Sequence, residues 1–291
     1  MSKKLRIAMG QLLVEGGVPN RNLNRAKELI ERAAKQEADL ILLPETIDFA
    51  WTHPLALERS LPIPGDYSDF FVQLAQKYSL YICVGLTEKT SSINYNTAIL
   101  IDPEGNILTK YRKINLLNVE FPFYGVGKRL EVIELPWGNF GVNICSDNYF
   151  DSKEIGITLA RMGAQVILSP CAWTVDHSIV EGVNPYGKKW KQSFDFFAET
   201  LGVATVSSTS VGYIVGGPYQ GMKMMGGSLT RLPGGRYLEC QFNEFTSDLL
   251  VFDLTLPFSS MKGIEMSRLL KQSSHRSVFF SHLPIINTGE V

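Results

Sequence analysis

The sequence predicts an α/β protein built from two mixed β-sheets that pack face to face, with helices on the outside. Two stretches of the chain alternate between amphipathic helices and apolar strands, which indicates parallel strands covered by helices. Short strands joined by tight turns separate these stretches and indicate antiparallel neighbours. No linker interrupts this order, so we expect one domain over residues 1–256 and a separate C-terminal tail over residues 257–291.

Length and composition are those of an ordinary globular protein. The chain has 291 residues, of which 45% are hydrophobic and 20% are charged. Its formal net charge is -1, from 28 Lys and Arg against 29 Asp and Glu. This balance gives no electrostatic reason to expect binding to nucleic acid or to an anionic membrane. A small, neutral molecule is the favoured partner.

The sequence predicts a cytoplasmic protein without a membrane segment. No segment reaches the ~18 consecutive apolar residues that a membrane-spanning helix requires, and the apolar run near the N-terminus is too short for a signal peptide. The cysteines lie far apart without a C-x-x-C pair, so we expect free thiols, with no zinc site and no redox motif. They are Cys83, Cys145, Cys171 and Cys240.

Hydrophobic periodicity predicts the elements of the first half of the chain. The run ADLILLPE, which ends at Glu45, is continuously apolar, as in a strand that is buried on both faces. Cys83 lies inside a second such strand and is expected to be part of the core. In order, the expected elements are a strand over 5–11, a helix over 20–37, a strand over 38–45, a helix over 67–78 and a strand over 80–86.

From residue 94 the pattern changes to strands connected by tight turns. These strands are expected over 97–101, 107–113, 131–135 and 140–145. A helix follows, for which we expect Ser152 as the N-cap, Leu159 and Met162 on the buried face, and Gly163 as the end.

The last third returns to helix and strand and ends in hairpins. The glycine-rich segment 212–227 lacks the order of a phosphate-binding loop, so we expect a mobile loop there. The expected elements are a strand over 164–170, a helix over 186–201, and strands over 203–209, 226–232, 236–242 and 248–254.

Cys145 lies where an alternating apolar run stops. Phe140, Val142 and Ile144 alternate with smaller or polar residues, as in a strand with one buried face, so the thiol is expected where the strand gives way to a loop. Loops beyond the carboxyl ends of strands commonly carry the chemistry of α/β folds. A structural role is the alternative, because a free cysteine often acts as a small hydrophobic residue.

A cysteine nucleophile needs a base that removes its proton, because the thiolate is the reactive form. None of the four histidines lies in a sequence context known for Cys-His enzymes; they are His53, His177, His275 and His282. Glu45 is a better candidate, since a carboxylate at the end of a buried strand is costly without a partner or a function. Lys113 closes the run KYRK, although an exposed position is equally compatible with its charged neighbours.

Together these residues form part of a larger pattern. The chain contains, in order, LLPE with Glu45, YRK with Lys113, GVNICSD with Cys145, RMGAQVILSP over 161–170, and GGS and PGG over 226–228 and 233–235. In this order it resembles the carbon-nitrogen hydrolase family, the nitrilase and amidase superfamily, in its amidase-like branch. The resemblance implies a four-layer αββα sandwich and a Glu-Lys-Cys triad. It also implies a second glutamate after the lysine, for which Glu120 is the match.

The resemblance implies a mechanism without metal or cofactor. Glu45 would take the thiol proton, Cys145 would attack the carbonyl carbon, and Lys113 with the backbone N–H of Ser146 would hold the oxyanion. Glu120 would fix Lys113. The implied function is hydrolysis of a non-peptide C–N bond in a small amide or N-carbamoyl compound through a thioester, with release of ammonia or an amine.

The residues after the nucleophile depart from the pattern of true nitrilases. Those members carry Cys-Trp-Glu, whereas this chain has Cys145, Ser146 and Asp147, which favours amides and carbamoyl compounds over nitriles. Nitrile hydrolysis, acyl or amidine transfer by the same chemistry, and a catalytically silent binding protein of the same fold remain the alternatives.

Residues next to the nucleophile are the candidate walls of a substrate pocket. They are Ser146, Asn148, Tyr149 and Phe150 on its loop, and Trp173 after the strand that ends in LSP. Trp173 could equally pack at the rim. Cys171 also ends a strand and is the rival nucleophile, although it lacks the family motif. The loops over 46–64 and 175–189 are expected to determine which substrate binds.

The C-terminal tail predicts an oligomer. Several apolar residues of the tail have no obvious partner within the chain and would form an exposed sticky patch; they are Leu269, Leu270, Val278, Phe279 and Phe280. This observation and the family resemblance predict a homodimer or a higher homo-oligomer, with the tail at its interface.

Overall fold

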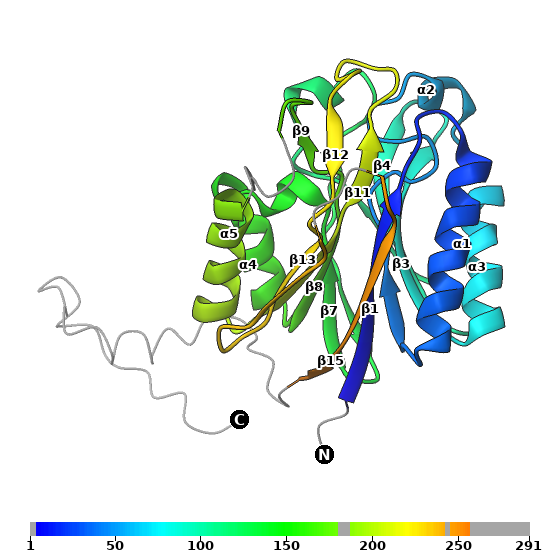
Figure 1. Cartoon of the computed structure of the whole chain (residues 1–291). Coiled ribbons are helices and arrows are strands. Elements are labelled where there is room, and N and C mark those ends of the chain that lie inside the picture. Colours follow the sequence, from blue (N-terminus) through cyan, green and yellow to red (C-terminus); the bar gives the residue numbers. More distant parts are fainter. Residues whose placement is uncertain (1–3, 180–186, 242–244, 257–291) are drawn as a thin grey trace, which may run out of the picture.

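The computed structural model describes residues 4–179, 187–241 and 245–256, which form two β-sheets with helices outside them (Figure 1). In the first sheet the strand order is β5-β4-β3-β2-β1-β11-β12-β9, and β15 also pairs with β1. These strands are β1 (Lys4–Leu13), β2 (Leu40–Leu42), β3 (Tyr81–Lys89), β4 (Asn94–Ile101), β5 (Ile107–Arg112), β9 (Thr174–Val175), β11 (Ser210–Tyr213), β12 (Lys223–Met225) and β15 (Asp248–Thr255).

The second sheet has the order β14-β13-β10-β8-β7-β6. Its strands are β6 (Val132–Leu135), β7 (Gly138–Val142), β8 (Val166–Pro170), β10 (Ala204–Ser208), β13 (Leu229–Arg231) and β14 (Tyr237–Glu239). Both sheets are mixed. Strands connected through helices pair in parallel, as in β1-β2-β3 and β7-β8-β10, whereas the strands joined by tight turns, β3-β4-β5, β6-β7 and β13-β14, pair antiparallel.

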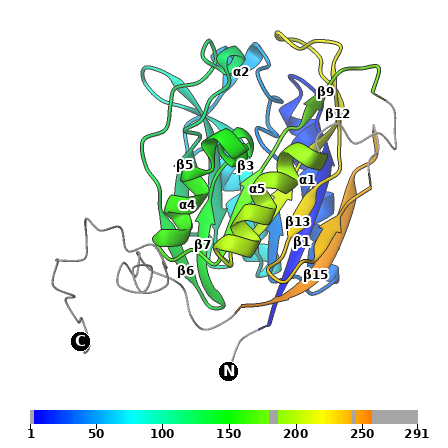
Figure 2. The ribbon, with the colours of Figure 1, turned by 90° about the vertical axis from the view of Figure 1, so that its left-hand side faces the viewer.

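Helices cover the outer face of each sheet, which confirms the predicted four-layer sandwich. Helices α1 (Pro19–Lys35) and α3 (Asp66–Tyr78) lie against the first sheet, and α4 (Glu154–Arg161) and α5 (Gly187–Thr200) lie against the second (Figures 1 and 2). The short helix α2 (Leu55–Arg59) lies in the long connection between β2 and α3.

The alternation of side chains along β2 explains why this strand is apolar throughout. Leu40 and Leu42 belong to the core between the two sheets, whereas Ile41 belongs to the core between the first sheet and its helices. Successive side chains of a strand point to opposite faces, so a strand inside a four-layer protein needs apolar residues at every position. The run ADLILLPE is thus confirmed as a strand buried on both sides.

The polar ends of several strands meet at one end of the sandwich. β2 and β5 lie in the first sheet and run in the same direction, because β2 is parallel to β3 and two antiparallel pairings connect β3 to β5. β7 and β8 are parallel neighbours in the second sheet. The residues that follow these strands, including the predicted site, therefore come from both sheets.

The glycine-rich segment 212–227 is not the loop that we expected, because it carries a hairpin. β11 and β12 pair antiparallel, and β12 also pairs with β9. Gly216 and Gly217 have φ values of 78° and 76° and lie in the turn of the hairpin. Val211 and Ile214 are buried and anchor its first arm. Nine residues, 214–222, connect the two strands, and the glycines among them adopt positive φ values.

Two details at the ends of α4 also differ from expectation. Met162 is 41% exposed, so it does not face the core, whereas Leu159 is fully buried. Ser152 is not the N-cap, since Lys153 occupies that position and the Ser152 hydroxyl donates to the carbonyl of Ser146 at 2.7 Å. The Ser152 side chain thus braces the loop that carries Cys145. Gly163, with a φ of 107°, follows the helix end as expected.

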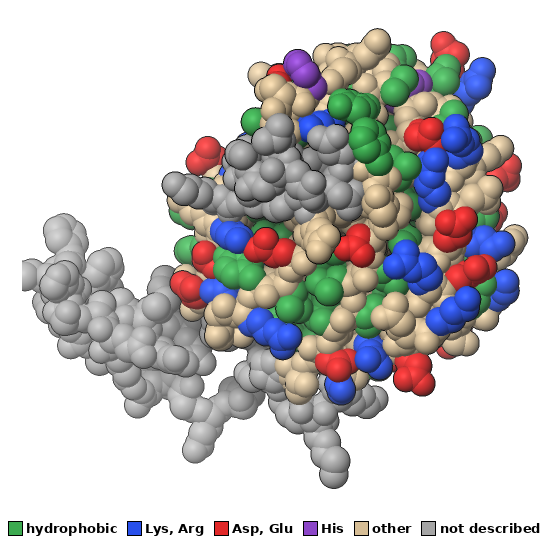
Figure 3. Space-filling view, in the orientation of Figure 1, with side chains coloured by type: hydrophobic (Ala, Val, Ile, Leu, Met, Phe, Trp, Pro, Cys, Tyr) green, Lys and Arg blue, Asp and Glu red, His purple; other side chains and the backbone are tan. Residues whose placement is uncertain are grey.

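The predicted tail over residues 257–291 lies outside the described residues, as do His275 and His282 within it. The boundary at residue 256 therefore stays a prediction. β15 ends at Thr255, and Leu256 is still buried in the core. On the face seen in Figure 3, acidic and basic side chains are interspersed over the region of α1 and α3. Among the described residues, no helix is both long enough and apolar enough to cross a membrane.

Candidate active site

Glu45, Lys113 and Cys145 come together from three separate strand ends. Glu45 follows β2 by three residues, Lys113 follows β5 directly, and Cys145 follows β7 by three residues. All three are buried, with exposed fractions of 1%, 1% and 7%. The sequence separates the first and last of them by a hundred residues, but the ends of the two sheets bring them together.

Lys113 forms ion pairs with two buried glutamates. Its Nζ lies 2.9 Å from Oε1 of Glu45 and 2.9 Å from Oε1 of Glu120. Burial alone would lower the pKa of Lys113, but the negative charges of Glu120 and Glu45 raise it well above its ordinary value. The ammonium group is therefore fixed in its charged form by these two carboxylates.

Glu120 is held rigidly in this arrangement. It ends the 3₁₀ helix η1 (Asn118–Glu120), and its Oε2 accepts the backbone N–H of Leu117 at 2.8 Å. Its Oε1 accepts the indole N–H of Trp51, also at 2.8 Å. With both oxygens occupied, Glu120 can orient Lys113 without being available to move a proton.

Glu45 has one occupied and one unoccupied oxygen. Oε1 accepts from Lys113 and, at 2.5 Å, from the side-chain amide of Asn96. Oε2 is buried and has no hydrogen-bond partner among the described residues. Burial raises the pKa of Glu45, and the charge of Lys113 offsets part of that increase. A buried carboxylate with a raised pKa and a free oxygen is suited to accept a proton.

Cys145 occupies a strained backbone position. It opens the 3₁₀ helix η2 (Cys145–Asn148) with a φ of 46°, in a region that non-glycine residues rarely adopt. Asp147 holds this turn, because its Oδ2 accepts the backbone N–H of Ile144 at 2.9 Å and the hydroxyl of Tyr111 at 2.6 Å. The turn places the thiol beside Glu45 and Lys113 instead of in the sheet.

The surroundings of the Cys145 thiol disfavour its charged form. Burial raises its pKa well above the ordinary value, and a hydrogen bond with Cys171 and the charge of Glu45 raise it further, whereas Lys113 lowers it. A neighbouring base is therefore required before this sulfur can act as a nucleophile.

Cys171, the rival nucleophile, is enclosed. It is fully buried, and its thiol contacts the carbonyl of Ser169 at 3.4 Å and the Ser169 hydroxyl at 3.6 Å. Its backbone carbonyl accepts the N–H of Glu45 at 3.2 Å. Cys171 thus lies beside the site but is not among the residues that line the cavity described next.

A cavity of about 280 Å³ opens above Cys145 and Lys113. Of the predicted wall residues, Tyr149 and Trp173 line it. Trp51 and Lys189 also line it, and they lie in the two loops, 46–64 and 175–189, that were expected to determine which substrate binds. The remaining lining residues were not predicted from the sequence; they are Leu117, Ala172, Thr174, Trp190, Tyr219 and Met222. A cleft of this size is near the lower end of the range for small-molecule sites.

Three predicted wall residues do not line this cavity. Asn148 is buried, and its amide bonds to the side chains of Asn143 and Ser169 instead, at 2.9 Å and 2.8 Å. Phe150 packs on Phe196. The hydroxyl of Ser146 donates to the carbonyl of Asn115 at 2.6 Å. Adjacency in sequence was misleading here, because in the turn after Cys145 these side chains point away from the cavity. The oxyanion role of the Ser146 backbone N–H stays a prediction.

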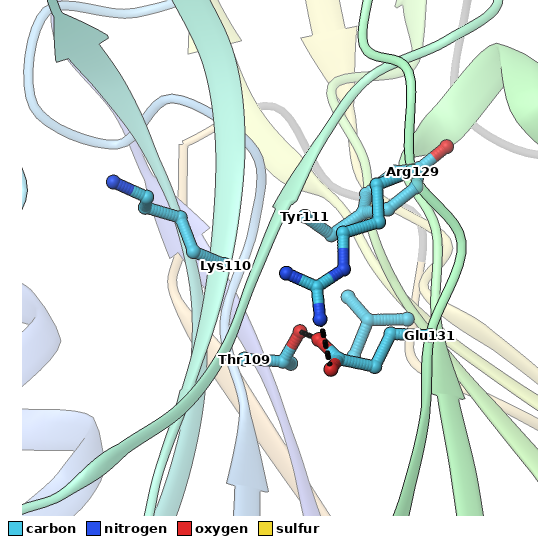
Figure 4. A pocket seen from close by; sticks show the side chains of 6 residues that line it. Thr109, Lys110, Tyr111, Arg129 and Glu131 are labelled. Carbon is cyan, nitrogen blue, oxygen red and sulfur yellow. Dashed lines mark hydrogen bonds and ion pairs between the residues drawn. The ribbon is translucent and has the colours of Figure 1, made fainter.

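A second depression lies between β5 and the segment before β6 (Figure 4). It encloses no room for a water molecule. Glu131 fills it, with Oε1 at 2.8 Å from Nη2 of Arg129 and Oε2 accepting the hydroxyl of Thr109. This depression is therefore not a ligand site. In the described part of the chain, no group of three or more His, Cys, Asp or Glu side chains could hold a metal ion.

Comparison with known proteins agrees with this geometry. A family model described as carbon-nitrogen hydrolase matches residues 6–259. A nitrilase from Pyrococcus abyssi is 35% identical over 175 residues, which are 58% of this chain and 64% of the relative. An omega-amidase from Xenopus tropicalis is 31% identical over 182 residues, 59% of this chain and 65% of the relative. The matches thus span slightly less than two thirds of these relatives.

Solved structures share the same architecture. An amidase from Nesterenkonia sp. superposes with a TM-score of 0.73 at 24% identity, covering 88% of this chain and 92% of that one. A mutant of the Nesterenkonia sp. AN1 amidase in complex with butyramide superposes with a TM-score of 0.72 at 24% identity, covering 86% and 90%. At this identity the likeness concerns the fold. The family model matches most of this chain, which shows that the chain belongs to the carbon-nitrogen hydrolase family.

Proposed function

We propose that this protein hydrolyses a non-peptide C–N bond of a small amide or N-carbamoyl compound through a cysteine thioester. The observation that carries the proposal is the state of Glu45. One of its oxygens is bound to Lys113, whereas the other is buried without a partner among the described residues, near Cys145 at the cavity. This arrangement provides a base, a nucleophile and a cation at one point.

In the first half-reaction Glu45 accepts the thiol proton while the sulfur of Cys145 attacks the amide carbon. The charge that develops on the carbonyl oxygen is stabilised by Lys113 and by the backbone N–H of Ser146. Glu45 then gives the proton to the leaving nitrogen, the C–N bond breaks, and ammonia or an amine departs from a thioester. In the second half-reaction water attacks the thioester and Glu45 takes its proton. The C–S bond breaks, the acid departs, and Glu45 returns the proton to the sulfur, which regenerates the thiol of Cys145.

The test is ammonia release from simple amides by the purified protein, combined with intact mass spectrometry of the trapped thioester. Cys145→Ala should abolish turnover and the mass increase. Glu45→Gln should leave a folded protein without turnover, and Lys113→Ala should reduce kcat/KM on the order of 10²-fold or more. Cys171→Ala is the matched control and should keep most of the activity. An active Cys145→Ala variant would contradict the assignment.

Nitriles are the second candidate substrates, because one relative is named a nitrilase. The sequence after the nucleophile, Cys145-Ser146-Asp147, favours amides instead. Each matching amide should therefore have a higher kcat/KM than its nitrile, and the opposite order in a paired panel would make nitrile hydrolysis the main reaction. Transfer of the acyl group to a second amine would appear as a new amide product in the same assay.

We further propose a homo-oligomer of cytoplasmic location. The oligomer is supported by the apolar residues in the tail, and the location by four free cysteines. Fractionation of expressing cells would test the location, since recovery with the membrane or secreted fraction would contradict it.

A further inference from the structure

Five of the twelve residues that line the cavity above Cys145 are aromatic. Its aromatic lining residues are Trp51, Tyr149, Trp173, Trp190 and Tyr219. They come from distant parts of the chain: the connection after β2, the loop after Cys145, the strand end after β8, helix α5, and the turn of the β11–β12 hairpin. Rings that gather at one cavity from five segments form a surface suited to a flat, apolar group.

These rings are fixed by contacts with one another. Trp173 stacks on Trp190 with centroids 4.7 Å apart and planes inclined by 18°. Tyr149 packs on Trp190 at 5.0 Å, and Trp51 packs on Tyr219 at 5.4 Å. Trp51 is also held by its hydrogen bond to Glu120. Because the walls are already ordered, a ligand would lose little free energy in arranging them.

The size of the cavity agrees with a single ring and a short linker. An apolar cavity of about 150 Å³ is large enough for benzene. The present cavity, at about 280 Å³, is nearly twice as large. It would hold a ring together with the amide group that must reach Cys145.

The charges at the cavity do not favour a carboxylate on the acyl group. Lys113 is already paired with two glutamates. The ammonium group of Lys189 lies 3.7 Å from the ring centroid of Tyr149, and burial lowers its pKa. A substrate carboxylate would have to draw Lys189 away from the ring of Tyr149 to gain an ionic partner, and would exchange its hydration for aromatic surface elsewhere.

We propose that the substrate is the amide of an uncharged acyl group that ends in an aromatic ring, of the arylacetamide or 3-arylpropanamide class. The ring lies against Trp51 and Trp173, and the amide carbon lies at Cys145. Arylacetamide and water give arylacetate and ammonia. This inference rests on the proposed amide hydrolysis and specifies its substrate class.

The first test compares kcat/KM for phenylacetamide, 3-phenylpropanamide, butyramide and succinamate with the wild-type protein. Aromatic contacts are worth about two- to twelvefold each beyond buried area, so we expect a phenyl amide to exceed butyramide and succinamate by about tenfold or more. A panel in which butyramide or succinamate equals or exceeds both phenyl amides would overturn the substrate class and leave amide hydrolysis intact.

The second test uses Trp173→Leu, with Trp137→Leu as its matched control. Trp137 packs on Tyr81 at 5.3 Å and is not among the residues lining the cavity. Trp173→Leu should raise KM for phenylacetamide about tenfold and change KM for butyramide less, whereas Trp137→Leu should affect both substrates alike. Equal losses for both substrates in Trp173→Leu would contradict a ring site at Trp173.

Binding to Cys145→Ala separates the two possible failures. If no amide releases ammonia, the proposed hydrolysis is wrong, and calorimetric titration of Cys145→Ala then decides on the ring site alone. Tighter binding of phenylacetamide than of butyramide would support the site. Equal or weaker binding of phenylacetamide would overturn it.

Discussion

At the scale of single residues, Asn96 connects the two carboxylates of the site. Its side-chain amide donates to Oε1 of Glu45 at 2.5 Å and to Oε1 of Glu120 at 3.4 Å, and the residue is fully buried. A donor stabilises the charged form of a carboxylate, so this bond lowers the pKa of Glu45 against the effect of burial. Asn96 therefore acts on the reaction through Glu45.

Replacing Asn96 should move the pH dependence of the reaction. Glu45 must be ionised to act as a base, so kcat/KM falls as the pH falls through the pKa of Glu45. Asn96→Ala removes a bond that lowers this pKa, so the acidic limb should move to higher pH. The control is Asn94→Ala. Asn94 lies on the same strand as Asn96, but its side chain donates to the backbone carbonyl of Ala56, away from Glu45. An unchanged acidic limb in Asn96→Ala would refute the role.

At the scale of elements, β3 fixes the backbone that carries Glu45. Gly85 of β3 donates to the carbonyl of Pro44 at 3.0 Å and accepts from the N–H of Ile47 at 3.0 Å. A Cβ atom at this glycine would lie 2.6 Å from Cα of Glu45. The close approach of the two segments therefore requires glycine at this position.

Gly85→Ala should reduce activity more than it reduces stability. The obstructing atoms belong to the backbone of Glu45 and its neighbours, so the carboxylate must shift, and a misplacement of about 1 Å can cost about 10²-fold in rate. Gly141→Ala is the matched control, because its nearest atoms belong to the flexible side chain of Leu159, at 3.1 Å. Steady-state kinetics and thermal unfolding of both variants measure the two effects. Full activity in Gly85→Ala would contradict this account.

The segment after β2 also contains a buried carboxyl group that forms no ion pair with a described residue. Asp48 is fully buried and accepts the backbone N–H of Thr87 at 2.9 Å. Burial raises its pKa from 3.8 to about 6. The folded protein thus holds this proton more tightly than the unfolded chain does, so the contribution of Asp48 to stability is greatest below pH 3.8 and is lost as the pH rises through about 6.

Asp48→Asn should remove this pH dependence. The difference between the two pKa values corresponds to about 3 kcal/mol. Relative to wild type, the free energy of unfolding of the variant should therefore increase by up to about that amount between pH 4 and pH 7, in addition to a pH-independent cost of altered hydrogen bonds. Denaturant titrations at several pH values measure it. A difference that does not vary with pH would rule out the raised pKa.

At the scale of the whole molecule, the site depends on the packing of one sheet on the other. Glu45 and Lys113 belong to the first sheet and Cys145 to the second, so the sandwich must form before the triad exists. The core cluster between the sheets contains Leu42 from one side and Val142 from the other, close in sequence to Glu45 and Cys145. Stability of this core and integrity of the site are therefore linked.

Removal of residues 257–291 should change the assembly and not the fold. The described core extends to Leu256, and the apolar residues of the tail have no predicted partner within one chain. A chain that stops after Leu256 should have the circular dichroism of the full chain and a smaller mass by light scattering, measured at equal micromolar concentration. If the truncated chain and the full chain form oligomers with the same number of subunits, the tail is not required at the interface and this prediction is wrong.

Local patterns in the sequence predicted the layers of the fold and singled out the residues that we propose as the centre of the site. Apolar periodicity distinguishes strands buried on both faces from helices with one buried face, and this distinction is local along the chain. Glu45, Lys113, Cys145 and Glu120 were recognisable because each follows a short motif in a fixed order. Two predictions failed: Met162 was expected on the buried face of its helix, and the segment of the β11–β12 hairpin was expected to be a loop. In both places, contacts with neighbouring segments decide the outcome, and these contacts are not visible in the local sequence pattern.

Only the tertiary structure decided which other side chains reach the site. Asn96 comes from β4, Trp51 from the connection after β2, and Tyr219 from a hairpin that the sequence indicated as a loop. Asn148 and Phe150, although adjacent to the nucleophile in sequence, do not line the cavity. The direction of a side chain after a turn depends on backbone angles such as the φ of 46° at Cys145, and contacts between distant segments depend on how the two sheets pack.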